Sequence, residues 1–149
     1  MHGRLRTMFG RQDWWVSAPL DSDGQAKIQD ARATLRRLRK NVDNPNSVVA
    51  ELTFGFWVSL LASRYHRTLW VPGLARTFPR ARRADVHRDY RHVLTFRNRV
   101  MHYEPIHHRH LEADYATLRR LIGQLSKEAL VEATAHDRVP VVLARRVRT

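Results

Sequence analysis

The stretch from residue 47 to 64 limits what this chain can fold into more than any other feature. Its side chains are apolar almost all the way round a helix, and Glu51 is the only charge within the apolar run. A helix that is apolar on every face belongs at the centre of a helical bundle. We therefore predict a central helix over residues 47–64. A buried Glu51 would need a basic partner, and we expect a structural ion pair with Arg97 or Arg99.

Three further long helices are predicted from apolar residues that recur with a helical period. They cover residues 25–42, 82–103 and 108–134. Pro105 is predicted to end the helix over residues 82–103. Residues predicted to face inward from the helix over 82–103 are Val86, Tyr90, Val93, Leu94 and Val100. The fold class is therefore all-α, a bundle of about four main helices. A single turn is predicted near residues 74–78.

Breaker residues and charge divide the chain into three parts. We expect an N-terminal segment at 1–24, a helical domain at 25–136 and a basic C-terminal tail at 137–149. In the first part, Trp14 and Trp15 could stack on bases, but packing against the helices is the favoured interpretation.

The balance of charge indicates the kind of partner. The 149 residues include 27 Lys and Arg against 14 Asp and Glu, a net charge of +13. This excess favours RNA or another polyanion, although a generally basic surface would give the same count. The chain has no cysteine, which excludes disulfides, thiolate metal sites and cysteine nucleophiles, and fits the cytoplasm. Its apolar stretches are shorter than the roughly 20 residues of a membrane span, so no membrane association is expected.

The segment around Arg97, Asn98 and His102 carries the most chemical information. Asn98 and His102 are four residues apart and share a helix face. Arg97 and His102 are five apart and point about 140° away from each other. The two side chains could flank a groove, or they could meet across a two-fold axis with a second copy of the helix.

These residue types suit phosphodiester cleavage without a metal. His102 lies in the predicted last turn of its helix, where the helix dipole favours a protonated imidazole that can act as an acid. Arg97 supplies fixed positive charge for a phosphate that gains negative charge in the transition state, and the Asn98 amide could orient either partner. The structural alternative is a basic helix end whose His102 caps carbonyl groups.

The same segment resembles the signature of the HEPN superfamily, an Arg followed by four to six residues and then a His, often with a polar residue after the Arg. A wider resemblance is to bacterial Abi-like proteins, named for abortive phage infection. The segments that carry it are Val49–Trp57, Leu69-Trp70, Arg97–His102, Glu104–Ile106 and Arg138–Pro140. Many relatives have His at the position of Tyr103. Relatives also usually carry further helical sequence before Trp14, so we expect a chain shortened at its N-terminus.

The resemblance implies a HEPN-like bundle that forms a homodimer and acts as a metal-independent ribonuclease in phage defence or a toxin system. An antitoxin or a phage-derived trigger would control it, and no cofactor is implied. The implied catalytic residues are Arg97, Asn98 and His102. Supporting or structural roles fall to Glu51, Arg99, Tyr103 and Glu104.

Two alternatives concern the basic surface around this segment. Residues expected to contact RNA are Arg97, Arg99, His107, His108 and Arg109. The histidines among them lack the spacing of a zinc site, so no metal is expected. A non-catalytic module that binds RNA or protein is the alternative to the ribonuclease.

Overall fold

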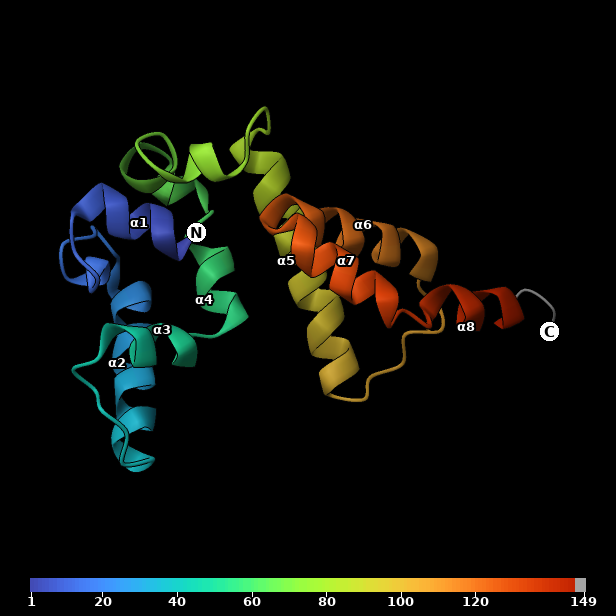
Figure 1. Ribbon diagram of the computed structural model, residues 1–149, viewed down its shortest axis with the longest axis horizontal. Helices are drawn as coiled ribbons and strands as arrows, with labels where there is room; N and C mark the ends of the chain where they lie inside the picture. The colour runs from blue at the N-terminus through green and yellow to red at the C-terminus, as the bar shows by residue number, and fades with distance from the viewer. Residues whose placement is uncertain (147–149) are drawn as a thin grey trace. The chain divides into compact units, whose positions relative to one another are not determined.

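The computed structural model describes residues 1–146, and every regular element in that range is helical (Figure 1). This confirms the prediction of an all-α fold. The chain forms two compact units, Met1–His87 (unit 1) and Arg88–Thr149 (unit 2). The last three residues of the predicted basic tail, 147–149, lie outside the described residues.

The N-terminal segment of unit 1 contains helix α1 (His2–Phe9) and the short 3₁₀ turn η1 (Trp14–Val16). Trp14 and Trp15 are both buried, and the indole Nε1 of Trp14 donates a hydrogen bond to Nδ1 of His2 at 3.1 Å. Their burial confirms that the two tryptophans serve packing, and it makes the first residues of the chain part of the core of unit 1.

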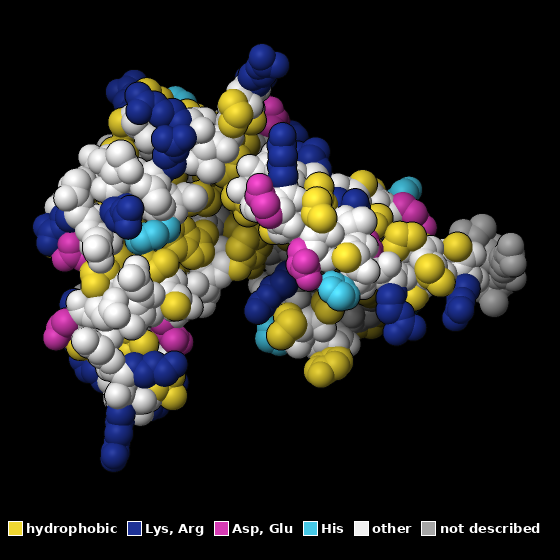
Figure 2. Space-filling model, in the orientation of Figure 1, with side chains coloured by type: hydrophobic (Ala, Val, Ile, Leu, Met, Phe, Trp, Pro, Cys, Tyr) yellow, Lys and Arg dark blue, Asp and Glu magenta, His cyan; other side chains and the backbone are white. Residues whose placement is uncertain are grey.

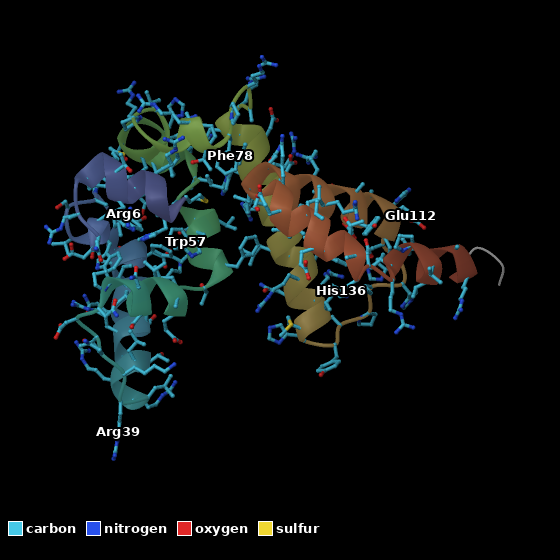
Figure 3. The ribbon with its side chains drawn as sticks, in the orientation of Figure 1. Arg6, Arg39, Trp57, Phe78, Glu112 and His136 are labelled. Atoms are coloured by element: carbon cyan, nitrogen blue, oxygen red, sulfur yellow. The ribbon has the colours of Figure 1, made fainter. Side chains whose placement is uncertain are left out.

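Helix α2 (Ser22–Arg37) follows and differs from its prediction at both ends. It begins three residues earlier because the side chain of Asp21 accepts a hydrogen bond from the backbone N–H of Gly24 at 2.9 Å, which caps the helix. It ends before the predicted Val42 because Arg39 adopts a left-handed conformation with φ of 54°. The Arg39 side chain extends away from this end of the helix (Figure 3).

The prediction of one continuous helix over residues 47–64 is wrong. The structure has helix α3 (Pro45–Glu51) and helix α4 (Phe54–Ser59), separated by two extended residues, Leu52 and Thr53. The Thr53 hydroxyl accepts a hydrogen bond from the N–H of Phe56 at 3.3 Å and so begins a new helix. Most of the apolar side chains are still in the core, including Leu52, Phe56, Val58, Leu60 and Leu61. A run that is apolar on every face can therefore be buried as two short helices.

Three short elements complete unit 1. They are the 3₁₀ turn η2 (Ser63–Tyr65), the π-helical turn η3 (His66–Trp70) and the 3₁₀ turn η4 (Leu74–Thr77). The last confirms the predicted turn near residues 74–78. Phe78, labelled in Figure 3, stacks on Trp70 with ring centroids 5.8 Å apart and planes 10° apart, which fixes η4 against η3.

The boundary between the two units falls in helix α5 (Arg83–Met101), so most of this helix belongs to unit 2. Three helices follow it in unit 2. Helix α6 (Leu111–Leu125) packs against helix α7 (Lys127–Ala135) and helix α8 (Val139–Arg146). The predicted helix over residues 82–103 is confirmed to within two residues.

Two sequence expectations for this region need correction. The predicted helix over 108–134 is interrupted at Ser126, which is extended and whose hydroxyl accepts a hydrogen bond from the N–H of Ala129 at 3.0 Å. Val86, Tyr90 and Val93 are buried as predicted, but Val100 is 45% exposed. The reason is that α6 begins only at Leu111, so the last turn of α5 extends beyond the residues that α6 covers.

Candidate functional site

The C-terminal end of α5 has a defined cap that positions His102. The N–H of Tyr103 donates to the carbonyl of Val100 at 3.2 Å, and the N–H of Glu104 donates to the carbonyl of Arg99 at 2.9 Å. Tyr103 has the left-handed φ of 56° that this Schellman motif requires. His102 is therefore the C-cap residue, at the negative end of the helix dipole.

Arg97, Asn98 and His102 are all exposed on this end of α5. The guanidinium of Arg97 donates to Oδ1 of Asn98 at 3.3 Å, and the backbone N–H of His102 donates to the carbonyl of Asn98 at 2.9 Å. The Asn98 side chain thus contacts Arg97, whereas its link to His102 is a backbone hydrogen bond of the helix end. Within the described part of the chain, the side chains of Arg97 and His102 form no hydrogen bond with each other.

The loop that follows α5 folds back on Arg99. The Arg99 guanidinium lies 3.8 Å from a carboxylate oxygen of Glu104 and donates to Nε2 of His108 at 3.4 Å. The rings of His107 and His108 meet edge to face with centroids 5.6 Å apart, and both residues are exposed. Four of the predicted supporting and RNA-contacting residues therefore lie together beside the end of α5.

Arg109 lies in a different environment, against a buried carboxylate. Asp114 on α6 is 3% exposed and is the only buried charged residue in the described part of the chain. Arg109 donates to both of its oxygens, from Nε at 2.7 Å and from Nη2 at 2.8 Å. The Arg109 guanidinium also lies over the ring of Phe96, 5.5 Å from its centroid. Its fork-shaped donor set matches the carboxylate and neutralises it.

His92 on α5 completes this cluster, because its Nε2 contacts Oδ1 of Asp114. The Arg109 guanidinium, followed by the contact with His92, holds the pKa of the Asp114 carboxyl below its usual range. The His92 side chain remains 44% exposed. A histidine that is oriented by a buried carboxylate and open to solvent has the arrangement of a general base.

His92 and Asp114 were not identified from the sequence as site residues. A signal for Asp114 was present, because it lies three residues after Leu111 and four before Leu118, on the apolar stripe of α6. An acid on such a stripe needs a cation beside it when the stripe is buried. His92 has no comparable signal, since its partner lies 22 residues away in sequence.

Glu51 belongs to unit 1 and is half-buried at the end of α3. It borders a small cavity of about 80 Å³ together with Lys27 and Asp30. Arg97 and Arg99 belong to unit 2, so an ion pair of either with Glu51 stays a prediction.

Two features that other classes of function would use are absent from the side chains and helices of residues 1–146, namely a metal-binding cluster and a membrane-spanning helix. Within residues 1–146, no three His, Asp or Glu side chains are grouped closely enough to hold a metal ion. Over the same range, no helix combines the length and the apolar character needed to cross a bilayer. Comparison of the chain with protein-family models, with curated proteins and with solved structures finds no match.

Proposed function

We propose that this protein cleaves RNA without a metal ion, using Arg97 and His102 at the end of α5, with Asn98 between them. The observation that carries the proposal is the exposure of all three side chains at the C-terminal end of one helix, in a chain of net charge +13. The resemblance of this segment to Abi-like and HEPN proteins supports the same function, and it is the reason to look for the activity in phage defence or a toxin system.

The chemistry follows from the residue types. His102 would remove the proton from a ribose 2′-hydroxyl, whose oxygen then attacks the adjacent phosphorus. Arg97 would stabilise the charge that develops on the phosphoryl oxygens. The bond to the 5′-oxygen breaks and that oxygen takes up a proton, which leaves a 2′,3′-cyclic phosphate and a 5′-hydroxyl. In a homodimer, His102 of the second copy could supply this proton.

The test compares variants of the full chain on labelled RNA in excess EDTA. We expect His102→Ala to lower the cleavage rate by about 10²–10⁴-fold, the usual contribution of a general acid or base. Arg97→Ala should lower it by about 10²–10³-fold. Cleavage products of the wild type should carry the cyclic phosphate and a free 5′-hydroxyl.

Matched controls remove the same residue types elsewhere. His136→Ala on the segment after α7 and Arg37→Ala on α2 change exposed side chains and should leave the rate unchanged. Cleavage that survives in both site variants would refute the proposal, as would cleavage that EDTA abolishes.

A second candidate function is binding of RNA or of a partner protein without turnover. Within the described residues of one chain, no hydrogen bond joins the Arg97 and His102 side chains, which favours this function because catalysis would need both to act on the same phosphate. Binding of RNA by the wild type and both variants, with no cleavage by any of them, would support this module.

A solution mass of one chain under cleaving conditions would refute the participation of a second copy.

A further inference from the structure

A second group of cationic side chains lines a groove in unit 1, on elements other than the one that carries Arg97 and His102. An open groove of about 850 Å³ runs between the π-helical turn η3 and the start of α5. Its ten lining residues include four arginines and one histidine, and none of the ten is acidic. In Figure 2, Lys and Arg side chains gather over the upper part of unit 1, which is the part that Figure 1 draws in green.

Two of the four arginines are held in place by other groups of unit 1. Arg64 forms an ion pair with Asp21 at 2.8 Å, and Arg83 donates to the carbonyl of Leu61 at 2.7 Å. Arg67 and Arg82 are exposed, and their side chains form no hydrogen bond or ion pair with another described residue. The groove therefore combines two fixed guanidiniums with two that are free to bind an anion.

The backbone around the groove is unusual on both sides. In η3, the N–H of Val71 donates to the carbonyl of His66 at 3.0 Å, the spacing of a π-turn, which is rare and concentrated at functional sites. On the other side, Arg80 has a left-handed φ of 64°, two residues before Arg82. Such a conformation costs about 1–3 kcal/mol in a residue other than glycine and is common at ligand-binding segments.

The start of α5 adds to the positive potential of the groove. Arg82 precedes the helix, and its carbonyl accepts hydrogen bonds from the N–H groups of Asp85 and Val86, each at 3.1 Å. The positive end of the dipole of a 19-residue helix therefore lies at the wall that Arg82, Arg83 and Ala84 form.

We propose that this groove binds the phosphate backbone of a single-stranded nucleic acid. Arg67 and Arg82 neutralise successive phosphates, while Arg83, which is held by a neutral carbonyl, adds fixed positive charge and the charge of Arg64 is offset by Asp21. The apolar part of the lining, formed by Ala81, Ala84 and the small exposed part of Trp70, gives the groove a surface for the sugars of the chain. This site is independent of the cleavage proposed for Arg97 and His102.

The experiment uses a probe that transesterification cannot cleave. A labelled oligothymidylate lacks 2′-hydroxyls, so its binding to the full chain is measured whether or not the protein is a nuclease. The double substitution Arg67→Ala with Arg82→Ala should weaken binding about tenfold and lower the slope of log K against log salt by about 1.4, or about 0.7 for each lost phosphate contact.

A matched control removes two exposed arginines from α2 in the same unit, Arg36→Ala with Arg37→Ala. Equal weakening by both double variants would overturn the proposal, because it would show a response to net charge alone. Competition separates the sources of phosphate: inorganic phosphate should displace the oligonucleotide only at high concentration, and vesicles containing phosphatidylserine should not displace it. Displacement by vesicles would also overturn the proposal.

A second readout keeps the arginines intact. Because the chain has no cysteine, Thr68→Cys gives a single thiol in the groove for a fluorescent label, and Gln29→Cys on α2, an exposed residue outside the groove lining, gives a control. The oligonucleotide should change the emission of the label at position 68 and leave that at position 29 unchanged. A silent label at 68 under saturating oligonucleotide would refute binding in the groove.

Discussion

Nε2 of His92 contacts Oδ1 of Asp114, which joins α5 to α6 through a carboxylate that is almost completely buried. Arg109 donates to both oxygens of the same carboxylate. Three elements of unit 2, namely α5, α6 and the segment before α6, therefore meet at one charged group. Because the burial of a carboxylate is unfavourable unless it is paired, the cluster stabilises unit 2 only while all three partners are present.

The first prediction concerns the removal of this charge. Asp114→Asn keeps the size of the side chain but leaves Arg109 without its ionic partner, and we expect the free energy of unfolding to fall by about 3 kcal/mol. Urea denaturation followed by circular dichroism measures the change. The control is Glu112→Gln at the exposed residue labelled in Figure 3, two positions earlier on α6, which should change the stability by less than about 1 kcal/mol. Equal effects at the two positions would contradict the role assigned to Asp114.

The second prediction gives the pH dependence of the same cluster. The Arg109 guanidinium lowers the pKa of Asp114 below its usual 3.8, so the unfolded chain binds a proton more readily than the folded one. The stabilisation that comes from this lowered pKa is complete above the pKa that Asp114 has in the unfolded chain. It is lost as the pH falls through the pKa that Asp114 has in the folded protein. Melting temperatures of the wild type and of Asp114→Asn should therefore differ most near neutral pH and converge below about pH 4. A difference in melting temperature that grows on acidification would show that folding raises the pKa of Asp114 and does not lower it.

The bounds of a helix could be predicted from the sequence where its apolar stripe ended next to a helix-breaking residue. Helix α5 is such a case, since its stripe and Pro105 placed its end within two residues. The run over 47–64 is the opposite case, because a segment that is apolar on every face has no stripe from which an interruption could be recognised. The break depends on Thr53, whose capping hydrogen bond to Phe56 is local chemistry that hydrophobic periodicity does not record.

The candidate site was predicted in part for a similar reason. Arg97, Asn98 and His102 lie within six residues of one helix, so the sequence could place them at the same helix end, although spacing alone left open whether Arg97 and His102 face one groove. The partnership of His92 with Asp114 and the groove at Arg67 and Arg82 each join segments that are distant in sequence, and only the fold brings them together.

The third prediction concerns the cap that positions His102. Tyr103 has a left-handed φ of 56° and a side chain that is 96% exposed. Glycine adopts this conformation without steric cost, which favours the folded protein, but it also gives the unfolded chain more conformational entropy. The net effect of Tyr103→Gly should be a rise in the free energy of unfolding of about 0.5–1 kcal/mol. Tyr103→Ala keeps the Cβ and should change little. Destabilisation by glycine alone in urea unfolding would contradict the left-handed cap.

The last prediction tests the break that replaces the expected central helix. The hydroxyl of Thr53 caps α4, so Thr53→Ala should lower the free energy of unfolding by about 1 kcal/mol, whereas Thr53→Ser should retain most of the cap. Ser126→Ala removes the equivalent cap of α7 in unit 2 and should cost a similar amount, which makes it the matched control. If residues 47–64 formed one helix, the result at Thr53 would reverse. Alanine favours a helix interior over threonine, and Thr53→Ala would then stabilise the protein.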